Sequence, residues 1–393
     1  MNPLGILYIA NFLLSFHLFL VVYYNSSFLT GLLNSVPIGG FLGSFTSEQL
    51  VGWIFTIGSA LGIISLILIS KALNNLGYYR LLISLTSLQL ILFFSFSLLE
   101  NPLLIILLFI LYLFNYPLIL YTLDVFLENY TKEVNTGSVR GTFLTTTNTA
   151  LIVAPLIAGL ILNNVGFGPL YFISALFLIP FLLIMRRFRG FKDPQYHKLQ
   201  AFRTFRCILT NKNLYRIFMS HFLMRFFFSW MVIYMPIYLT SHIGFTWAEF
   251  GILTFIVLLP FAILELPAGK IADKLLGEKE LLSLGFFIAG LFIMLVSFIE
   301  VQSFIFWAAV LFMTRVGMSL VEIMTESYFF KHVDGDDNNT ISFFRITRPL
   351  AYITGPIIAF FALQFLDFQY IWVVLGLVTL YGLRYSLTIK DTR

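Results

Sequence analysis

The chain alternates between long apolar stretches and short polar connections. A helix that crosses a bilayer needs about 20 predominantly apolar residues. By that criterion the sequence predicts an all-α integral membrane protein with twelve transmembrane helices. The predicted spans are residues 4–24, 49–70, 78–99, 102–126, 143–163, 168–186, 216–240, 249–270, 281–300, 303–328, 343–365 and 369–388.

Two polar breaks are longer than the others. Residues 25–48 contain Gly, Ser and Pro, and we expect them to form an extracellular loop. Residues 187–215 are rich in Lys and Arg, so we expect a cytoplasmic linker that lies on the anionic inner leaflet. This linker divides the chain into two six-helix bundles, residues 1–186 and residues 216–393.

The composition agrees with a lipid environment. The chain is 59% hydrophobic and only 11% charged, whereas soluble proteins have about 25% charged residues. Cys207 is the single cysteine, which excludes a disulfide framework and a cysteine-based metal site. The first apolar stretch lacks a basic leader and a small-residue cleavage site, so we predict a retained span, not a signal peptide.

Lys and Arg residues determine the predicted orientation. If the N-terminus lies inside, the connections assigned to the outside carry no Lys or Arg, and the inside connections carry many. The positive-inside rule then places both termini in the cytoplasm, in a multi-pass protein of the cell membrane. The net charge of +5 follows from this topology, and we expect no nucleic-acid partner.

The two halves of the chain are repeats at a nearly constant offset. Gly52 corresponds to Gly251, and each follows a similar polar turn. Pro155 in the fifth predicted span corresponds to Pro356 in the eleventh. Parallel six-helix repeats, related by an axis along the membrane normal, place a substrate site at their interface near the midplane.

A polar turn between the eighth and ninth spans carries the most specific motif. The pattern is Gly-x-x-x-Asp-Arg/Lys-x-Gly-x-Arg/Lys, and it is matched with one extra residue before the second glycine. The matching residues are Gly269, Asp273, Lys274, Gly277 and Lys279.

The corresponding turn between the second and third spans departs from the pattern. Ser70 replaces the glycine, Asn74 the aspartate and Asn75 the base. Only Gly77 and Arg80 remain.

These motifs, the twelve spans, the repeat and the basic linker resemble the major facilitator superfamily of secondary transporters over essentially the whole chain. In that family the motif loop is part of the inside gate. The resemblance therefore implies a gate whose N-terminal half is weaker or differently connected. We expect Asp273 and Arg345 to bridge the two halves when the protein faces outward.

Acidic pairs support the predicted gate. Asp124 and Glu128 are four residues apart and share a helix face, and Glu322 and Glu326 repeat this spacing. We expect Glu128 to pair with Arg80, and Glu326 to pair with Lys279. The complete set of candidate gating residues is Asp273, Lys274, Gly269, Gly277, Lys279, Arg80, Asp124, Glu128, Arg140, Glu322, Glu326, Arg345 and Arg348.

Polar residues deep in the predicted spans are candidate substrate ligands. A charge at the bilayer centre costs at least about 2.5–3.5 kcal/mol on insertion scales, and such residues usually serve function. The structural alternatives are an Arg225–Glu265 ion pair, a hydrogen-bonded interior His17, and hydrogen bonds between helices. The candidates are Arg315, Arg225, Glu265, His17, Asn115, Tyr116 and Asn148.

The sequence contains no Walker loop, no His-Glu-x-x-His and no Gly-x-Ser-x-Gly motif, so we expect neither an enzyme nor a cofactor. We predict a monomeric secondary active transporter that works by alternating access on a small-molecule substrate. Proton coupling and facilitated uniport both remain open.

Arg225 and Arg315 favour an anionic or carboxylate-bearing solute. If Glu265 neutralises Arg225, a sugar or an exported amphipathic drug fits as well. The remaining alternative is a receptor or scaffold that has the same fold and does not transport.

Overall fold

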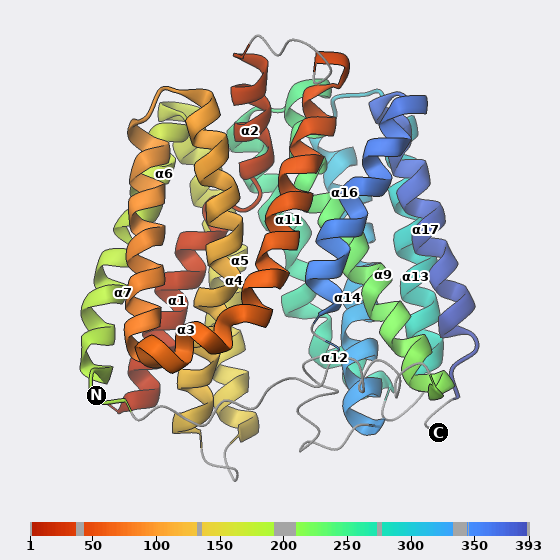
Figure 1. The fold of residues 1–393 in the computed structure, drawn as a ribbon. Helices are drawn as coiled ribbons and strands as arrows, with labels where there is room; N and C mark the ends of the chain where they lie inside the picture. The colour runs from red at the N-terminus through yellow and green to blue at the C-terminus, as the bar shows by residue number, and fades with distance from the viewer. Residues whose placement is uncertain are drawn as a thin grey trace. The chain divides into compact units, whose positions relative to one another are not determined.

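The computed structural model describes residues 2–36, 43–131, 136–191, 210–272, 277–332, 344 and 346–390. Helices account for most of these residues, and no β-strand occurs among them (Figure 1). Nine helical segments of the described chain are long and apolar enough to cross a bilayer, and Pro3–Phe19 is a shorter apolar helix. The all-α membrane class is therefore confirmed, whereas the count of twelve spans remains a prediction.

The chain forms two compact units, which we describe separately. Unit 1 consists of Met1–His197 together with Thr246–Phe255. Unit 2 consists of Lys198–Phe245 together with Ile256–Arg393. The bundle boundaries expected from the sequence, with a linker at residues 187–215, remain a prediction.

Local sequence signals start several helices of unit 1. The Asn2 side chain accepts a hydrogen bond from the Leu4 amide, and Pro3 occupies the first turn of α1. Thr46 and Gln49 form a capping box at the start of α3. The helices are α1 (Pro3–Phe19), α2 (Asn25–Asn34), α3 (Ser47–Leu98), α4 (Pro102–Tyr130), α5 (Thr136–Val165), α6 (Phe167–Leu176) and α7 (Leu178–Met185), followed by the 3₁₀ turn η3 (Arg186–Phe188).

A kink at Gly77 separates the two spans predicted within α3. Its φ of 73° lies in the left-handed region, which glycine adopts without a steric penalty. The glycine retained in this otherwise altered motif therefore has a backbone role: it turns the chain between two apolar helices.

The predicted loop at residues 25–48 is wrong in its first part, because Asn25–Asn34 form the helix α2 (Figure 1). Most of the polar side chains that suggested a loop are buried within unit 1; Asn25 and Thr30 form hydrogen bonds there, whereas the hydroxyls of Ser26 and Ser27 have no partner in the described structure. Tyr171 donates to Asn25 Oδ1 at 2.7 Å, and the Thr30 hydroxyl donates to the Ser26 carbonyl at 3.0 Å. Polar residues can lie inside a membrane bundle when neighbouring helices complete their hydrogen bonds.

Glycine allows the segment Thr246–Phe255 to pack closely within unit 1. A Cβ atom added to Gly159 of α5 would lie only 2.8 Å from the Cα atom of Gly251. Tyr24 packs against the same segment, with its ring 5.3 Å from the Phe250 ring. Small residues at a helix crossing let the two backbones approach one another.

Unit 2 begins with a nearly continuous apolar run, α9 (Lys212–Ile233), α10 (Met235–Ile237) and the π-helical turn η4 (Tyr238–His242). Gly277, with a φ of 83°, precedes α13 and repeats the role of Gly77. The later elements are α11 (Trp247–Ile263, whose first residues belong to unit 1), α12 (Glu265–Ile271), α13 (Glu278–Leu295), η6 (Val296–Phe298), α14 (Phe304–His332), α16 (Thr347–Phe365), η7 (Phe368–Tyr370) and α17 (Ile371–Ser386).

Close packing in unit 2 fixes the helices that carry the candidate site. A Cβ atom added to Gly285 of α13 would lie 2.6 Å from the carbonyl oxygen of Gly317 on α14. The Trp230 indole on α9 donates to the Gly355 carbonyl of α16 at 2.9 Å. Helix α9 also packs against α14 and α17. Residues on the facing sides of α9, α14 and α16 are therefore held close together.

Candidate functional site

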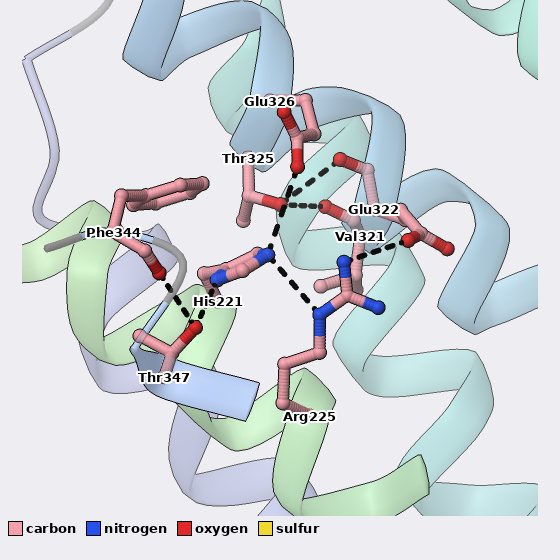
Figure 2. Close-up of polar contacts among 8 residues, drawn as sticks. All are labelled: His221, Arg225, Val321, Glu322, Thr325, Glu326, Phe344 and Thr347. Carbon is pink, nitrogen blue, oxygen red and sulfur yellow. Dashed lines mark hydrogen bonds and ion pairs between the residues drawn. The ribbon is translucent and has the colours of Figure 1, made fainter. Parts of the chain in front are cut away.

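A cluster of charged and polar side chains lies where α9, α14 and α16 meet in unit 2 (Figure 2). His221 and Arg225 are four residues apart on α9, so both side chains lie on one face. The Arg225 Nε atom donates a hydrogen bond to His221 Nε2 at 3.3 Å. Helix α14 presents Glu322 and Glu326, again four residues apart, to this pair.

Arg225 forms an ion pair with Glu322. Its Nη2 atom lies 3.1 Å from a carboxylate oxygen, and the two side chains are 23% and 24% exposed. One guanidinium therefore bridges a carboxylate and an imidazole, as Figure 2 shows. Arginine suits this role because its donors are arranged in a rigid planar fork.

The partners of His221 specify the position of its proton. Its Nδ1 atom lies 2.7 Å from the hydroxyl of Thr347, and that hydroxyl donates its own hydrogen to the Phe344 carbonyl. The hydroxyl oxygen therefore accepts from an Nδ1–H group. The Nε2 atom accepts from Arg225, so it carries a lone pair and the ring is neutral.

A second carboxylate lies near the same ring nitrogen. Glu326 Oε1 is 3.7 Å from His221 Nε2, beyond the length of a direct hydrogen bond. The Phe344 ring stacks on the imidazole with centroids 4.0 Å apart and keeps His221 buried. A proton that arrived at Nε2 would thus meet a carboxylate on one side and a guanidinium on the other.

Arg315 lies apart from this cluster. It is buried on α14, and its guanidinium carbon is 5.6 and 5.2 Å from the ring centroids of Phe227 and Phe228 on α9. Such cation–π contacts stabilise an arginine away from water. The structure therefore places the two candidate arginines of the sequence in different environments.

The structural alternative of an Arg225–Glu265 ion pair stays untested, and the described partner of Arg225 is Glu322. Arg225 pairs with Glu322, although the sequence suggested a gating role for that glutamate. Glu265 begins α12, but its side chain lies outside the described residues. Spacing along one helix cannot predict which neighbouring helix supplies the partner.

Both ring nitrogens of His17, the histidine candidate of unit 1, have hydrogen-bond partners. The ring is fully buried, and its Nδ1 atom lies 2.9 Å from the Ser174 carbonyl oxygen. Its Nε2 atom is 3.3 Å from the Gln89 amide nitrogen, and the Gln89 oxygen accepts from Asn115 at 3.0 Å. This geometry favours the hydrogen-bonded interior alternative for His17, whereas Asn115 donates from its amide nitrogen but has a buried Oδ1 atom without a partner in the described structure.

The two remaining ligand candidates are less enclosed. Tyr116 is half-buried on α4, with its ring 6.3 Å from that of Tyr112. Asn148 is half-buried on α5, whereas Asn11 donates to oxygens of the same helix, including Thr146 Oγ1 at 2.8 Å. Neither candidate joins the His17 network.

Among the gating candidates of unit 1, Arg140 pairs with Asp124 at 3.2 Å. The pair expected between Arg80 and Glu128, which are both described and exposed, is not formed in this structure. Arg140 is positioned for Asp124 because α4 and α5 are consecutive helices joined by a short connection.

Glu278 and Lys331 form an ion pair in unit 2 that was not among the contacts predicted from the sequence. Glu278 is 1% exposed, at the start of α13, and Lys331 lies in the last turn of α14. Nothing in the local sequence connects them, because more than fifty residues separate the two. The signal available was the position of Glu278 directly after the motif glycine Gly277.

The remaining gating candidates are only partly described. Glu326, expected to pair with Lys279, has His221 as a neighbour instead. Gly269 lies within α12, Gly277 directly precedes α13, and Arg348 is exposed on α16. Asp273, Lys274 and Arg345 lie outside the described residues.

A family sequence profile and a solved structure both match this chain, and both agree with the all-helical fold described above. The sequence profile described as the Major Facilitator Superfamily matches residues 7–251 and residues 217–389. The crystal structure determined in meso of the POT family transporter PepTSo superposes with a TM-score of 0.74. That match has 12% sequence identity and covers 98% of this chain and 96% of the other, so it shows a shared fold. The curated proteins contain no match to this chain.

Proposed function

Because this chain belongs to the Major Facilitator Superfamily, and is therefore a multi-pass secondary transporter and not an enzyme, we propose that it couples solute movement to protons through Arg225. The observation that carries this proposal is that Arg225 contacts His221 and Glu322 at once. A guanidinium shared by two titratable groups is sensitive to the protonation of either one.

The coupling follows from the hydrogen bonds of His221. In the neutral ring, Nε2 accepts from Arg225. A proton on Nε2 removes the acceptor, places a positive charge beside the guanidinium, and directs a donor toward Glu326, 3.7 Å away. Protonation would therefore break the Arg225–His221 bond and attract the ring toward α14.

Loss of that bond changes what Arg225 can bind. The guanidinium keeps Glu322 as a partner but gains free donor capacity, which suits a carboxylate or another anionic group on a solute. Both side chains are about one quarter exposed, so a solute can reach them. This is the basis for proposing an anionic or carboxylate-bearing substrate.

One observation favours a second candidate substrate class. Glu322 already neutralises Arg225 in the structure, so the pair as a whole has no net charge. A sugar or an amphipathic drug would then fit, with the pair donating and accepting hydrogen bonds.

We further propose, from the distribution of Lys and Arg, that both termini lie in the cytoplasm.

The test begins with a thermal-shift screen of the purified protein against monocarboxylates, dicarboxylates, amino acids, sugars and cationic drugs. Solutes that stabilise the protein are then applied to proteoliposomes that contain a pH-sensitive dye. We expect a stabilising carboxylate to acidify the lumen, and Glu322→Gln to abolish the acidification. Glu300→Gln, an exposed loop variant, is the matched control.

Two results would contradict the proposal. Solute uptake without proton movement, unaffected by an imposed pH gradient, would identify a uniporter. Stabilisation by cationic solutes alone would exclude the anionic substrate class.

A further inference from the structure

Unit 2 contains a cavity of about 380 Å³ that is separate from the His221–Arg225 cluster. It lies where α9 begins and α17 ends, which is the same end of unit 2 (Figure 1). Three of its lining side chains are cations and two are tyrosines. The lining residues are Lys212, Tyr215, Arg216, Arg384, Tyr385 and Thr388.

Neutral groups hold the two arginines of this cavity in place. Arg384 donates to the Tyr381 hydroxyl at 2.6 Å, and its guanidinium carbon lies 5.6 Å from the centroid of the same ring. Arg216 donates to the Thr388 carbonyl and to Asn213 Oδ1. In the part of the chain that the structure describes, neither arginine forms an ion pair, so both positive charges are uncompensated there.

The tyrosines indicate that the cavity lies at the surface of the bilayer. Tyr385 is within aromatic contact of Tyr215 and of Tyr381, with centroids 6.1 and 5.6 Å apart. Tyrosine is enriched where a membrane protein leaves the hydrocarbon core, because its ring is apolar and its hydroxyl is polar. The apolar span that includes α9 begins at Lys212, which agrees with this position.

An exposed apolar face leads along α17 to the cavity. Leu377, Tyr381 and Arg384 are spaced four and three residues apart, so they share one face of the helix. The side chains of Leu377 and Tyr381 are exposed, and Leu387 is exposed beyond them. This arrangement places an apolar stripe next to a cationic cavity, which complements a molecule that has an acyl chain and an anionic head.

We propose that this cavity binds the phosphate group of an anionic phospholipid, with an acyl chain along the exposed face of α17. Arginine forks and tyrosine hydroxyls are well suited to phosphate oxygens, and lysine adds a point charge. The volume lies within the range of small-molecule pockets, about 300–1,000 Å³. The bound lipid would join α17 to α9, the helix that also carries His221 and Arg225.

The test uses the full-length protein and native mass spectrometry after extraction into detergent. Phosphatidylglycerol, phosphatidylcholine and inorganic phosphate are added separately as probes. We expect phosphatidylglycerol to remain bound at low salt and to raise the midpoint of thermal unfolding. Arg216→Gln combined with Arg384→Gln should weaken that binding at least tenfold.

Further variants keep the result interpretable. Arg216 also holds the Thr388 carbonyl, so Lys212→Gln combined with Arg384→Gln is a second variant that leaves this contact intact. The matched control is Arg187→Gln combined with Arg189→Gln, which removes two exposed positive charges from unit 1. The control should bind phosphatidylglycerol as the wild type does.

Three outcomes would overturn the proposal. Retention of phosphatidylglycerol by both cavity variants would place the lipid elsewhere. Equal retention of phosphatidylcholine would indicate ordinary annular lipid. Stabilisation by inorganic phosphate, with displacement of phosphatidylglycerol, would assign the cavity to a soluble phosphate compound.

Discussion

Arg225 donates a hydrogen bond from Nε to Nε2 of His221, one helical turn away on α9, at 3.3 Å. A protonated imidazole nitrogen cannot accept this bond. The contact therefore links the proton content of His221 to the position of an arginine that also pairs with α14. The first two predictions follow from this relationship.

Arg225 and Glu322 should be energetically coupled. Removing one partner leaves the other charge uncompensated inside the bundle, so Arg225→Gln and Glu322→Gln should each lower the unfolding midpoint. The double variant should be less destabilised than the sum of the two, by about 1–3 kcal/mol. A double-mutant cycle of thermal or denaturant unfolding in detergent measures this difference. Additive effects would mean that the 3.1 Å pair contributes nothing to stability.

His221→Gln should uncouple transport from protons. Glutamine can keep a hydrogen bond to Thr347 or Arg225, but its amide has no site that exchanges a proton as an imidazole does. We expect proton-driven accumulation to fall at least tenfold, whereas exchange of labelled for unlabelled solute at equal pH should persist. Counterflow and uptake assays on the same proteoliposomes separate the two activities. Accumulation at the wild-type level would remove His221 from the coupling mechanism.

For His17 we expect an effect on stability and none on proton coupling, because both of its ring nitrogens have hydrogen-bond partners inside unit 1. His17→Leu should destabilise the protein by about 1–3 kcal/mol, since it removes the hydrogen bond to the Ser174 carbonyl and leaves the buried Gln89 amide nitrogen without its imidazole partner. The number of protons moved per solute should not change. A changed stoichiometry in a reversal-potential measurement would instead assign His17 to the proton pathway.

The Glu278–Lys331 pair should be a structural contact. Lys331→Met removes the ammonium partner of a carboxylate that is 1% exposed, which should cost at least about 2 kcal/mol. Lys331→Arg preserves the charge and should retain most of the stability. Thermal unfolding of the two variants tests this, and an unchanged midpoint for Lys331→Met would show that Glu278 is neutral in the folded protein.

Much of the fold could be predicted from local sequence. Apolar length predicted helices that cross the membrane, and Asn2, Thr46 and Asn101 mark helix starts because a side chain caps each one. Gly77 and Gly277 mark turns because each adopts a positive φ. These are interactions within a few residues, so the sequence alone contains the information.

The sequence could predict each of the two residue pairs of the candidate site, but not that the pairs meet. The four-residue spacing placed Glu322 and Glu326 on one face, and it applies equally to His221 and Arg225. The sequence could not show that these faces meet, since the contact depends on how α9 packs against α14. For this reason the Arg225–Glu265 alternative weighed from the sequence did not include Glu322 as a partner.

The sequence by itself thus determined the membrane environment, the helical class and the local ends of helices, because apolar length, caps and glycines act over short distances. Only the tertiary structure decided which polar groups satisfy one another. Asn25 is hydrogen-bonded to Tyr171 and His221 to Thr347, and Arg225 forms an ion pair with Glu322, in each case on a different helix. In a medium without water, a polar side chain must bond to whichever neighbour packing supplies, so its role depends on the folded bundle.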